Sequence, residues 1–253
     1  TDVTVGDIAT GGNVSLTATT GSILDADVDG DSNLNISAAG LRLNAGTAIG
    51  AGGNHLETTV GTLTARAANG GIFVRESDGL IVGDVAVTVN RVLTDGTVTS
   101  STVTDATQSD VITTGGNGSV VLRTSAGSIV LNDGTAGTSG VSVSANGSGN
   151  VLIEAIGAGT DVTANVDVTS TSGHVTVLGA QSVSFAAGAD IRTGTVGTID
   201  VGAGTGSVTM DATSLYTTGT GAIRVLAATD VTVGDIATGG NVSLTATTGS
   251  ILD

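Results

Sequence analysis

The residues with the clearest potential for chemistry form the run DADVDGD, whose four carboxylates are Asp25, Asp27, Asp29 and Asp31. Alternate carboxylates of this kind can converge on one hard cation, and glycine at the sixth position allows the sharp turn of a calcium loop. The glutamate that closes such a loop is missing, because Ile36 stands at the twelfth position. The sequence therefore predicts that any bound metal is calcium at these four aspartates, and it requires no cofactor.

A second interpretation of the same run stays open. In a strand, Leu24, Ala26 and Val28 would point inward and the aspartates would face solvent. The Asp-Gly pair that follows would then form a corner. On this interpretation the carboxylates would only be exposed to water and would bind no metal.

Catalytic residues are not apparent in the sequence. The only imidazoles are His55 and His174, and His174 stands where other segments carry asparagine, which indicates a corner. No nucleophile has a recognisable base beside it. β-Helical polysaccharide-degrading enzymes use clustered carboxylates, basic residues and aromatic platforms, whereas here the basic residues are seven dispersed arginines. We therefore expect no enzyme, and a polysaccharide-degrading activity is the least favoured alternative.

Composition limits what can stabilise the chain and what can bind it. Glycine supplies 41 of 253 residues, and proline, cysteine and tryptophan are absent. The three aromatics are Phe73, Phe185 and Tyr216, so the core must be thin and aliphatic. The net charge of −16 disfavours nucleic acid and anionic membranes as partners. No apolar run approaches the roughly 20 residues of a membrane span, so no membrane insertion is expected.

An exact repeat is the strongest signal in the sequence, because residues 1–25 recur without change as residues 229–253. We interpret residues 1–228 as one tandem repeat unit and residues 229–253 as the start of the next. The expected partners are neighbouring identical repeats stacked head-to-tail, and the two identical segments should differ mainly by a displacement along the axis. The chain is expected to be a piece of a longer protein, since it begins without methionine.

A shorter period lies inside the long one. Strand-like alternation restarts after Asn150, His174, Thr198 and Ala222, which are evenly spaced along the chain. Each coil divides into three alternating segments separated by glycine-rich corners. The two longest intervals leave room for one further coil each, with Leu63 and Val98 in candidate strands.

The prediction is an all-β parallel β-helix (solenoid) of about ten coils with three short strands per coil. Ten coils spaced by about 4.8 Å would give a rise of about 48 Å for each copy of the repeat unit. A row of immunoglobulin-like sandwiches is the alternative all-β fold. It would need a buried aromatic core and edge prolines, and the sequence has neither.

Three segments carry a family resemblance: NVSLTATTGSILD (13–25), TLTARAANGGIFV (62–74) and SVVLRTSAGSIV (119–130). They resemble the repeats of filamentous-haemagglutinin-type exoproteins and giant haemagglutinin-like bacterial adhesins. The resemblance implies a right-handed β-helical shaft on a secreted or cell-surface bacterial protein. It also implies an extracellular location, no catalytic residues in the shaft, and host or neighbouring-cell contacts made by regions outside this chain.

The expected function is therefore a structural stalk or filament-forming repeat, which extends an adhesin or builds an extracellular fibre. The alternative is a glycan- or partner-binding module that uses threonine-rich strands such as residues 17–20 and 97–99. Such a face needs threonines aligned through several coils, and the changing coil lengths are expected to break that alignment.

Overall fold

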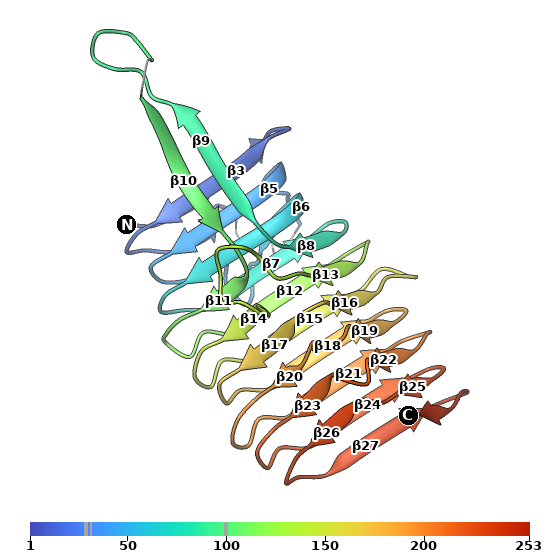
Figure 1. Cartoon of the computed structure of the whole chain (residues 1–253). Helices are drawn as coiled ribbons and strands as arrows, with labels where there is room; N and C mark the ends of the chain where they lie inside the picture. Colours follow the sequence, from blue (N-terminus) through green and yellow to red (C-terminus); the bar gives the residue numbers. More distant parts are fainter. Residues whose placement is uncertain (28–29, 31, 99–100) are drawn as a thin grey trace.

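Strands stacked along one axis make up most of the molecule, and a hairpin of β9 (Val85–Asn90) and β10 (Thr102–Gln108) projects from this stack (Figure 1). The computed structural model describes residues 1–27, 30, 32–98 and 101–253, and this part contains strands and turns but no helix. All strand pairings but β9–β10 are parallel, and from β11 onward each strand pairs with the strand three places further along the chain, as in β15–β18–β21–β24. The fold is an all-β parallel β-helix, and the sequence prediction is confirmed.

Three columns of paired strands form the wall. Column 1 contains β1 (Val3–Val5), β4 (Ile23–Asp25), β7 (Ile72–Glu76), β12 (Val120–Thr124), β15 (Val151–Ala155), β18 (Val175–Gly179), β21 (Ile199–Ala203), β24 (Ile223–Ala227) and β27 (Val242–Ala246). Column 2 contains β8 (Leu80–Val82), β13 (Ile129–Leu131), β16 (Val162–Ala164), β19 (Val183–Phe185), β22 (Val208–Met210), β25 (Val231–Thr232) and β28 (Ile251–Leu252). Column 3 contains β3 (Asn13–Ala18), β5 (Ile36–Ala45), β6 (Leu56–Ala67), β11 (Val111–Thr113), β14 (Val141–Ala145), β17 (Asp167–Ser170), β20 (Ile191–Arg192), β23 (Leu215–Thr217) and β26 (Asp235–Ala237). The short strand β2 (Ile8–Ala9) pairs with the start of β5. The long strands β5 and β6 each continue through a corner without a break.

Column 1 gives the number of coils, because one residue of each coil lies in register with the next. These residues are Val3, Ile23, Ile49, Ile72, Val120, Val151, Val175, Ile199, Ile223 and Val242. The chain therefore completes nine coils and begins a tenth with β27 and β28, so residues 1–228 hold fewer than the ten coils predicted for one repeat unit.

The interior is a narrow stack of small aliphatic side chains. In β18, Val175 and Val177 are fully buried, while the alternating residues Thr176 and Leu178 face outward. In-register pairing then stacks similar side chains on one another in successive coils, so that Val175 lies between Val151 and Ile199. Two aromatics join this core where Phe185 meets Tyr216 edge to face, with ring centroids 5.1 Å apart.

The second long interval contains an antiparallel hairpin and not a coil, so the prediction for Val98 is wrong. Strand β9 (Val85–Asn90) pairs antiparallel with β10 (Thr102–Gln108), and Val98 lies in the loop between them. Alternating Val and Thr suit either kind of strand, which is why the pattern could not distinguish them. The first long interval does contain an extra coil, and Leu63 lies in its strand β6.

The two identical segments form equivalent strands but occupy different columns. Strand β3 belongs to column 3, whereas its copy β27 belongs to column 1. Likewise β1 belongs to column 1 and its copy β25 to column 2. The predicted displacement mainly along the axis is therefore wrong, because one period of the repeat spans eight coils and one further strand. Each copy is rotated by one column relative to the previous copy.

A column of glycines forms the corner that precedes column 1. A Cβ at Gly149, Gly173, Gly197 or Gly221 would overlap the carbonyl oxygen of the glycine one coil earlier. Hydroxyls accompany this corner: the Thr193 Oγ1 donates to the Gly173 oxygen at 2.6 Å. Glycine is therefore required here by close backbone approach.

We predict that Gly197→Ala lowers the free energy of unfolding by roughly 1–3 kcal/mol, because its methyl group must displace the adjacent coil. Gly11→Ala is the matched control, since a Cβ there meets nothing within 4 Å. Urea denaturation of both variants measures the difference. Equal stability of the two would show that the corner does not need glycine.

Candidate functional site

The first residue of the predicted calcium run holds a loop in place. Asp25 lies at the end of β4 and is only 9% exposed. Its Oδ1 accepts hydrogen bonds from the Asn35 side chain at 2.6 Å and from the Asp27 backbone at 3.0 Å. Its Oδ2 accepts a bond from the Asn54 side chain at 2.8 Å. Both carboxylate oxygens of Asp25 therefore have protein donors.

These contacts correct one of the two interpretations of the run. Ile23 and Asp25 are buried, and Leu24 between them is partly exposed, so Asp25 faces the interior and not solvent. The strand alternation places it in register with Val5 one coil earlier. Asp29 and Asp31 lie outside the described residues. Among the residues that the structure describes, no three histidine, cysteine, aspartate or glutamate residues gather as a metal site.

The calcium site stays a prediction with a direct test. If calcium binds the run, it raises the melting temperature of the wild type but not of the Asp27→Asn/Asp29→Asn variant. An equal rise in both proteins would place the ion elsewhere. Asp25→Asn is the contrasting variant: it should lower stability without calcium, because it weakens charge-assisted bonds to Asn35 and Asn54.

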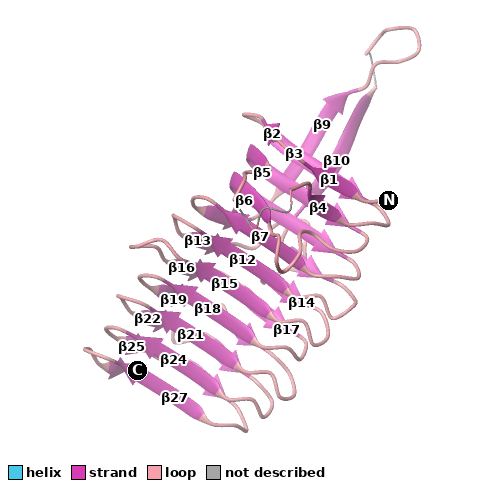
Figure 2. Cartoon of the chain, turned by 180° about the vertical axis from the view of Figure 1, so that it is seen from behind, coloured by secondary structure: helices cyan, strands magenta, loops and turns pink. Residues whose placement is uncertain are grey.

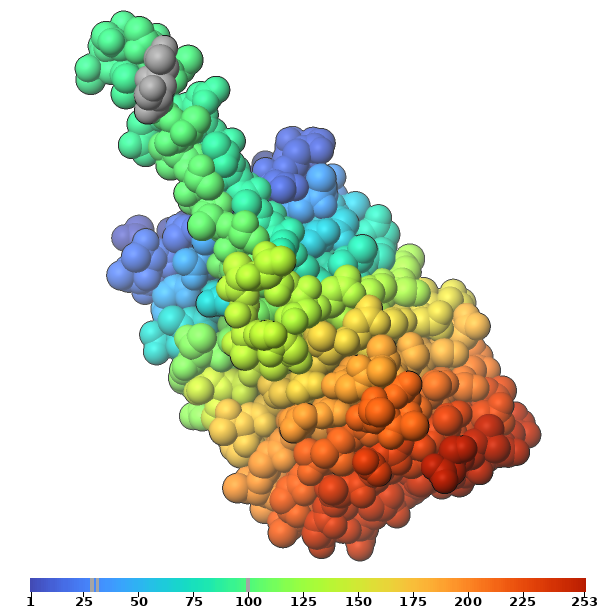
Figure 3. Space-filling view, viewed as in Figure 1, coloured from blue at the N-terminus to red at the C-terminus, as the bar shows by residue number. Residues whose placement is uncertain are grey.

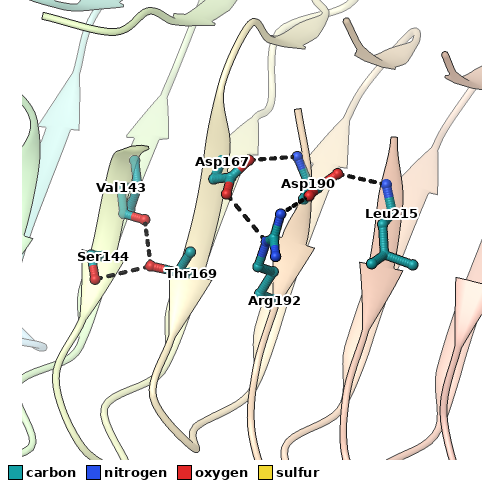
Figure 4. Close-up of polar contacts among 7 residues, drawn as sticks. All are labelled: Val143, Ser144, Asp167, Thr169, Asp190, Arg192 and Leu215. Atoms are coloured by element: carbon teal, nitrogen blue, oxygen red, sulfur yellow. Dashed lines mark hydrogen bonds and ion pairs between the residues drawn. The ribbon is translucent and has the colours of Figure 1, made fainter. Parts of the chain in front are cut away.

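Aspartates at the corners connect successive coils (Figure 4). The Asp190 backbone N–H donates to Asp167 at 2.9 Å, and the Leu215 N–H donates to Asp190 at 2.6 Å. Arg192 joins both carboxylates, with its Nε 3.2 Å from Asp167. The carboxylates therefore satisfy backbone groups that the strand ladder leaves unpaired at the corner.

The same kind of contact occurs in both identical segments. Asp2 accepts from the Ser22 N–H at 2.7 Å, and Asp230 accepts from the Ser250 N–H at 2.8 Å. His174 has the predicted corner role. Its backbone N–H donates to the Asn150 side chain at 2.8 Å, and its Nδ1 lies 2.8 Å from the Thr198 hydroxyl.

A buried carboxyl group is the strongest electrostatic anomaly. Glu76 ends β7 with its side chain inside the coil and no exposed surface. It accepts from the Thr58 hydroxyl at 2.7 Å and from the Val60 N–H at 3.1 Å. Burial, with a further contribution from the nearby Asp78, raises the pKa of Glu76 from 4.5 to about 7. Burial likewise raises the pKa of Asp110 to about 6. The alternation of Ile72, Val74 and Glu76 in β7 already places Glu76 on the inward face, whereas Asp110 precedes its strand and no such pattern marks it.

We predict that Glu76 makes stability fall as pH rises. Its pKa is higher in the folded than in the unfolded chain, so the folded state binds more protons between about pH 4.5 and 7. We compare the free energy of unfolding of the wild type with that of Glu76→Gln. The difference, wild type minus variant, should fall by on the order of 3 kcal/mol as the pH rises through this window. Glu154→Gln is the control, since Glu154 forms a partly exposed ion pair with Arg123. Parallel pH profiles for the wild type and Glu76→Gln would contradict the assignment.

Column 2 has an ordered polar outer face. Thr163, Ser184, Thr209 and Thr232 lie in register on four successive coils. The Ser184 hydroxyl donates to Thr163 at 3.3 Å. These coils align one hydroxyl residue each, whereas Thr17 lies in register with Asn44 and Arg66, so the threonines of residues 17–20 do not continue as a ladder through the next coils.

Comparisons with protein families, with curated proteins and with solved structures give no match for this chain. Among the described residues there is no helix of sufficient length and hydrophobicity to span a bilayer.

Proposed function

We propose that the chain is a structural stalk or filament-forming repeat of a giant secreted or cell-surface bacterial protein. The observation that carries this proposal is the relation between its ends. The last coil begins with β27, which has the same sequence as β3, and β27 pairs in register with β24 over five residues. The copy of β3 can therefore continue the stack from the coils that end the previous copy.

The mechanism is mechanical. Successive coils are joined by parallel backbone pairing, by corner aspartates and by surface ion pairs such as Arg224 with Asp200 at 2.7 Å. Each added copy lengthens such a rod without new chemistry. The proposed extracellular location and the link to an adhesin or a fibre rest on the resemblance of the repeats to haemagglutinin-like proteins.

We predict that each added copy lengthens the rod by about 40 Å, from eight coils and one strand at about 4.8 Å per coil. This value is smaller than the rise expected from the sequence, because the interval around Val98 forms a hairpin and because the equivalent strands β3 and β27 lie in different columns. The experiment compares this chain with a two-copy chain, residues 1–228 followed by residues 1–253, by small-angle X-ray scattering and electron microscopy. Two beads joined by a hinge, or an increment far from the predicted one, would contradict the proposal.

The ordered Ser/Thr face of column 2 favours one second candidate, a module that binds glycans along Thr163, Ser184, Thr209 and Thr232. Saturable binding on a glycan array would support it. A shaft without this activity would give none.

A further inference from the structure

The base of the β9–β10 hairpin and a loop of the following coil lie together over column 3. The hairpin leaves the fourth coil and runs back over the first three coils, and in both cartoon views it follows the axis and extends past the first coil (Figure 1 and Figure 2). The loop, residues 132–140, connects β13 with β14 in the fifth coil. In the space-filling view this loop, coloured yellow-green, lies against the base of the green hairpin (Figure 3).

A cleft of about 290 Å³ lies where these two segments meet the outer face of column 3. Ligand pockets have volumes of roughly 300–1,000 Å³, so this cleft suits one small group. The strands β5 and β6, the hairpin base and the loop all contribute to its lining, with Arg42, Asn44, Arg66, Ala106, Gln108 and Ala136.

Hydrogen bonds hold both segments that close the cleft. On the hairpin side, the Gln108 Nε2 donates to the Leu43 carbonyl at 2.8 Å. On the loop side, the Ala136 N–H donates to the Ser109 hydroxyl at 2.9 Å. The cleft is therefore formed by the fold itself, and a ligand would not have to order it.

The two arginines of the cleft have no acidic partner. No carboxylate in the described part of the chain forms an ion pair with Arg42 or Arg66. Arg42 instead donates to neutral acceptors, with its Nε 3.0 Å from the Ala106 carbonyl and one Nη 3.3 Å from the Ser15 hydroxyl. Two guanidinium groups without a carboxylate are an exception in a chain whose net charge is −16.

Arg66 has the greater need for an acceptor. Its Nε is buried and has no hydrogen-bond partner. A donor that is removed from water without a partner costs free energy, and more so when it is charged. Asp110 attracts Arg66 through space but forms no ion pair with it, and its carboxylate accepts from the Thr138 N–H at 3.1 Å. An anion in the cleft would supply the missing acceptor.

The chemistry of the cleft favours a carboxylate among the anions. The planar guanidinium fork matches the two oxygens of a carboxylate, which can accept from two of its N–H groups at once. Phosphate and sulfate have this geometry as well, but they carry up to twice the charge. The net charge of −16 therefore repels them more strongly than it repels a single carboxylate.

We propose that the Arg42–Arg66 cleft binds the carboxylate of a small organic acid. Arg66 holds the carboxylate oxygens, and Arg42 adds a second positive charge beside them. The ligand is either a simple carboxylic acid or a sugar acid, which share this group. This binding site goes beyond the proposed stalk function and does not depend on the stacking of copies, since all its residues belong to one copy.

The first test is a titration of the 253-residue chain with sodium glucuronate. The Nε–H signals of the seven arginines are followed by NMR, and calorimetry gives the affinity. The Arg66 signal should shift with saturation, and Arg66→Gln should weaken binding on the order of tenfold or more. Arg91→Gln is the matched control, because it removes the same charge from an exposed position outside the cleft. Equal weakening in both variants would reflect net charge alone and would overturn the proposal.

A second variant tests the position of the site without removing an arginine. Ala136 is exposed and its bond to Ser109 uses only the backbone, so Ala136→Asp should leave the melting temperature unchanged. Its carboxylate would lie in the cleft and should abolish glucuronate binding. Undiminished binding by this variant would refute the assignment to the cleft.

Comparison of ligands identifies the source of the carboxylate. Glucuronate that binds at least tenfold more tightly than acetate would assign the site to a sugar acid, and equal affinities would assign it to any small carboxylate. Either result supports a carboxylate site. No saturable shift of Arg66 with either compound, or tighter binding of inorganic phosphate at the same ionic strength, would refute it.

Discussion

In-register backbone pairing between successive coils is the interaction on which the rest of this structure depends. It fixes the distance between coils, so any corner residue must fit beneath the backbone of the neighbouring coil. Gly173, Gly197 and Gly221 follow from that constraint, since a Cβ at each would overlap the previous coil. The corner carboxylates follow from it as well, because Asp167 and Asp190 accept the N–H groups that the ladder leaves unpaired. The acidic composition thus has a structural use beyond solubility.

The β-helix was predictable from the sequence because alternation and coil length are both local patterns. Coils of equal length after Asn150 were predicted from their spacing, and the structure confirms them. The hairpin was not predictable, since Val-Thr alternation is the same in a parallel coil and in an antiparallel pair. The inward position of Asp25 was missed for another reason: its partners Asn35 and Asn54 are distant in sequence, and the choice of face depends on them.

The rotation between copies links the fold to the proposed function. A period of whole coils would place every hairpin on the same side of the rod, each over its own column 3 and above column 3 of the preceding copy. The additional strand in each period instead places β3 of one copy beneath column 1 of the preceding copy. Successive hairpins would then emerge from successive columns. The length of one copy and its rotation relative to the next therefore follow from the same count, eight coils and one strand.

The most direct test of the stacked coils is a set of distances along column 1. Phe73, Val121, Leu152, Thr176 and Ser243 lie in register on its outer face. Spin labels on cysteines paired with a label at Ser243→Cys should give distances of about 14, 19, 24 and 29 Å from Thr176, Leu152, Val121 and Phe73, because each coil adds about 4.8 Å. The account predicts narrow distributions that grow in equal steps, although the sequence separations are unequal. Broad distributions, or distances that follow sequence separation, would contradict the parallel stack.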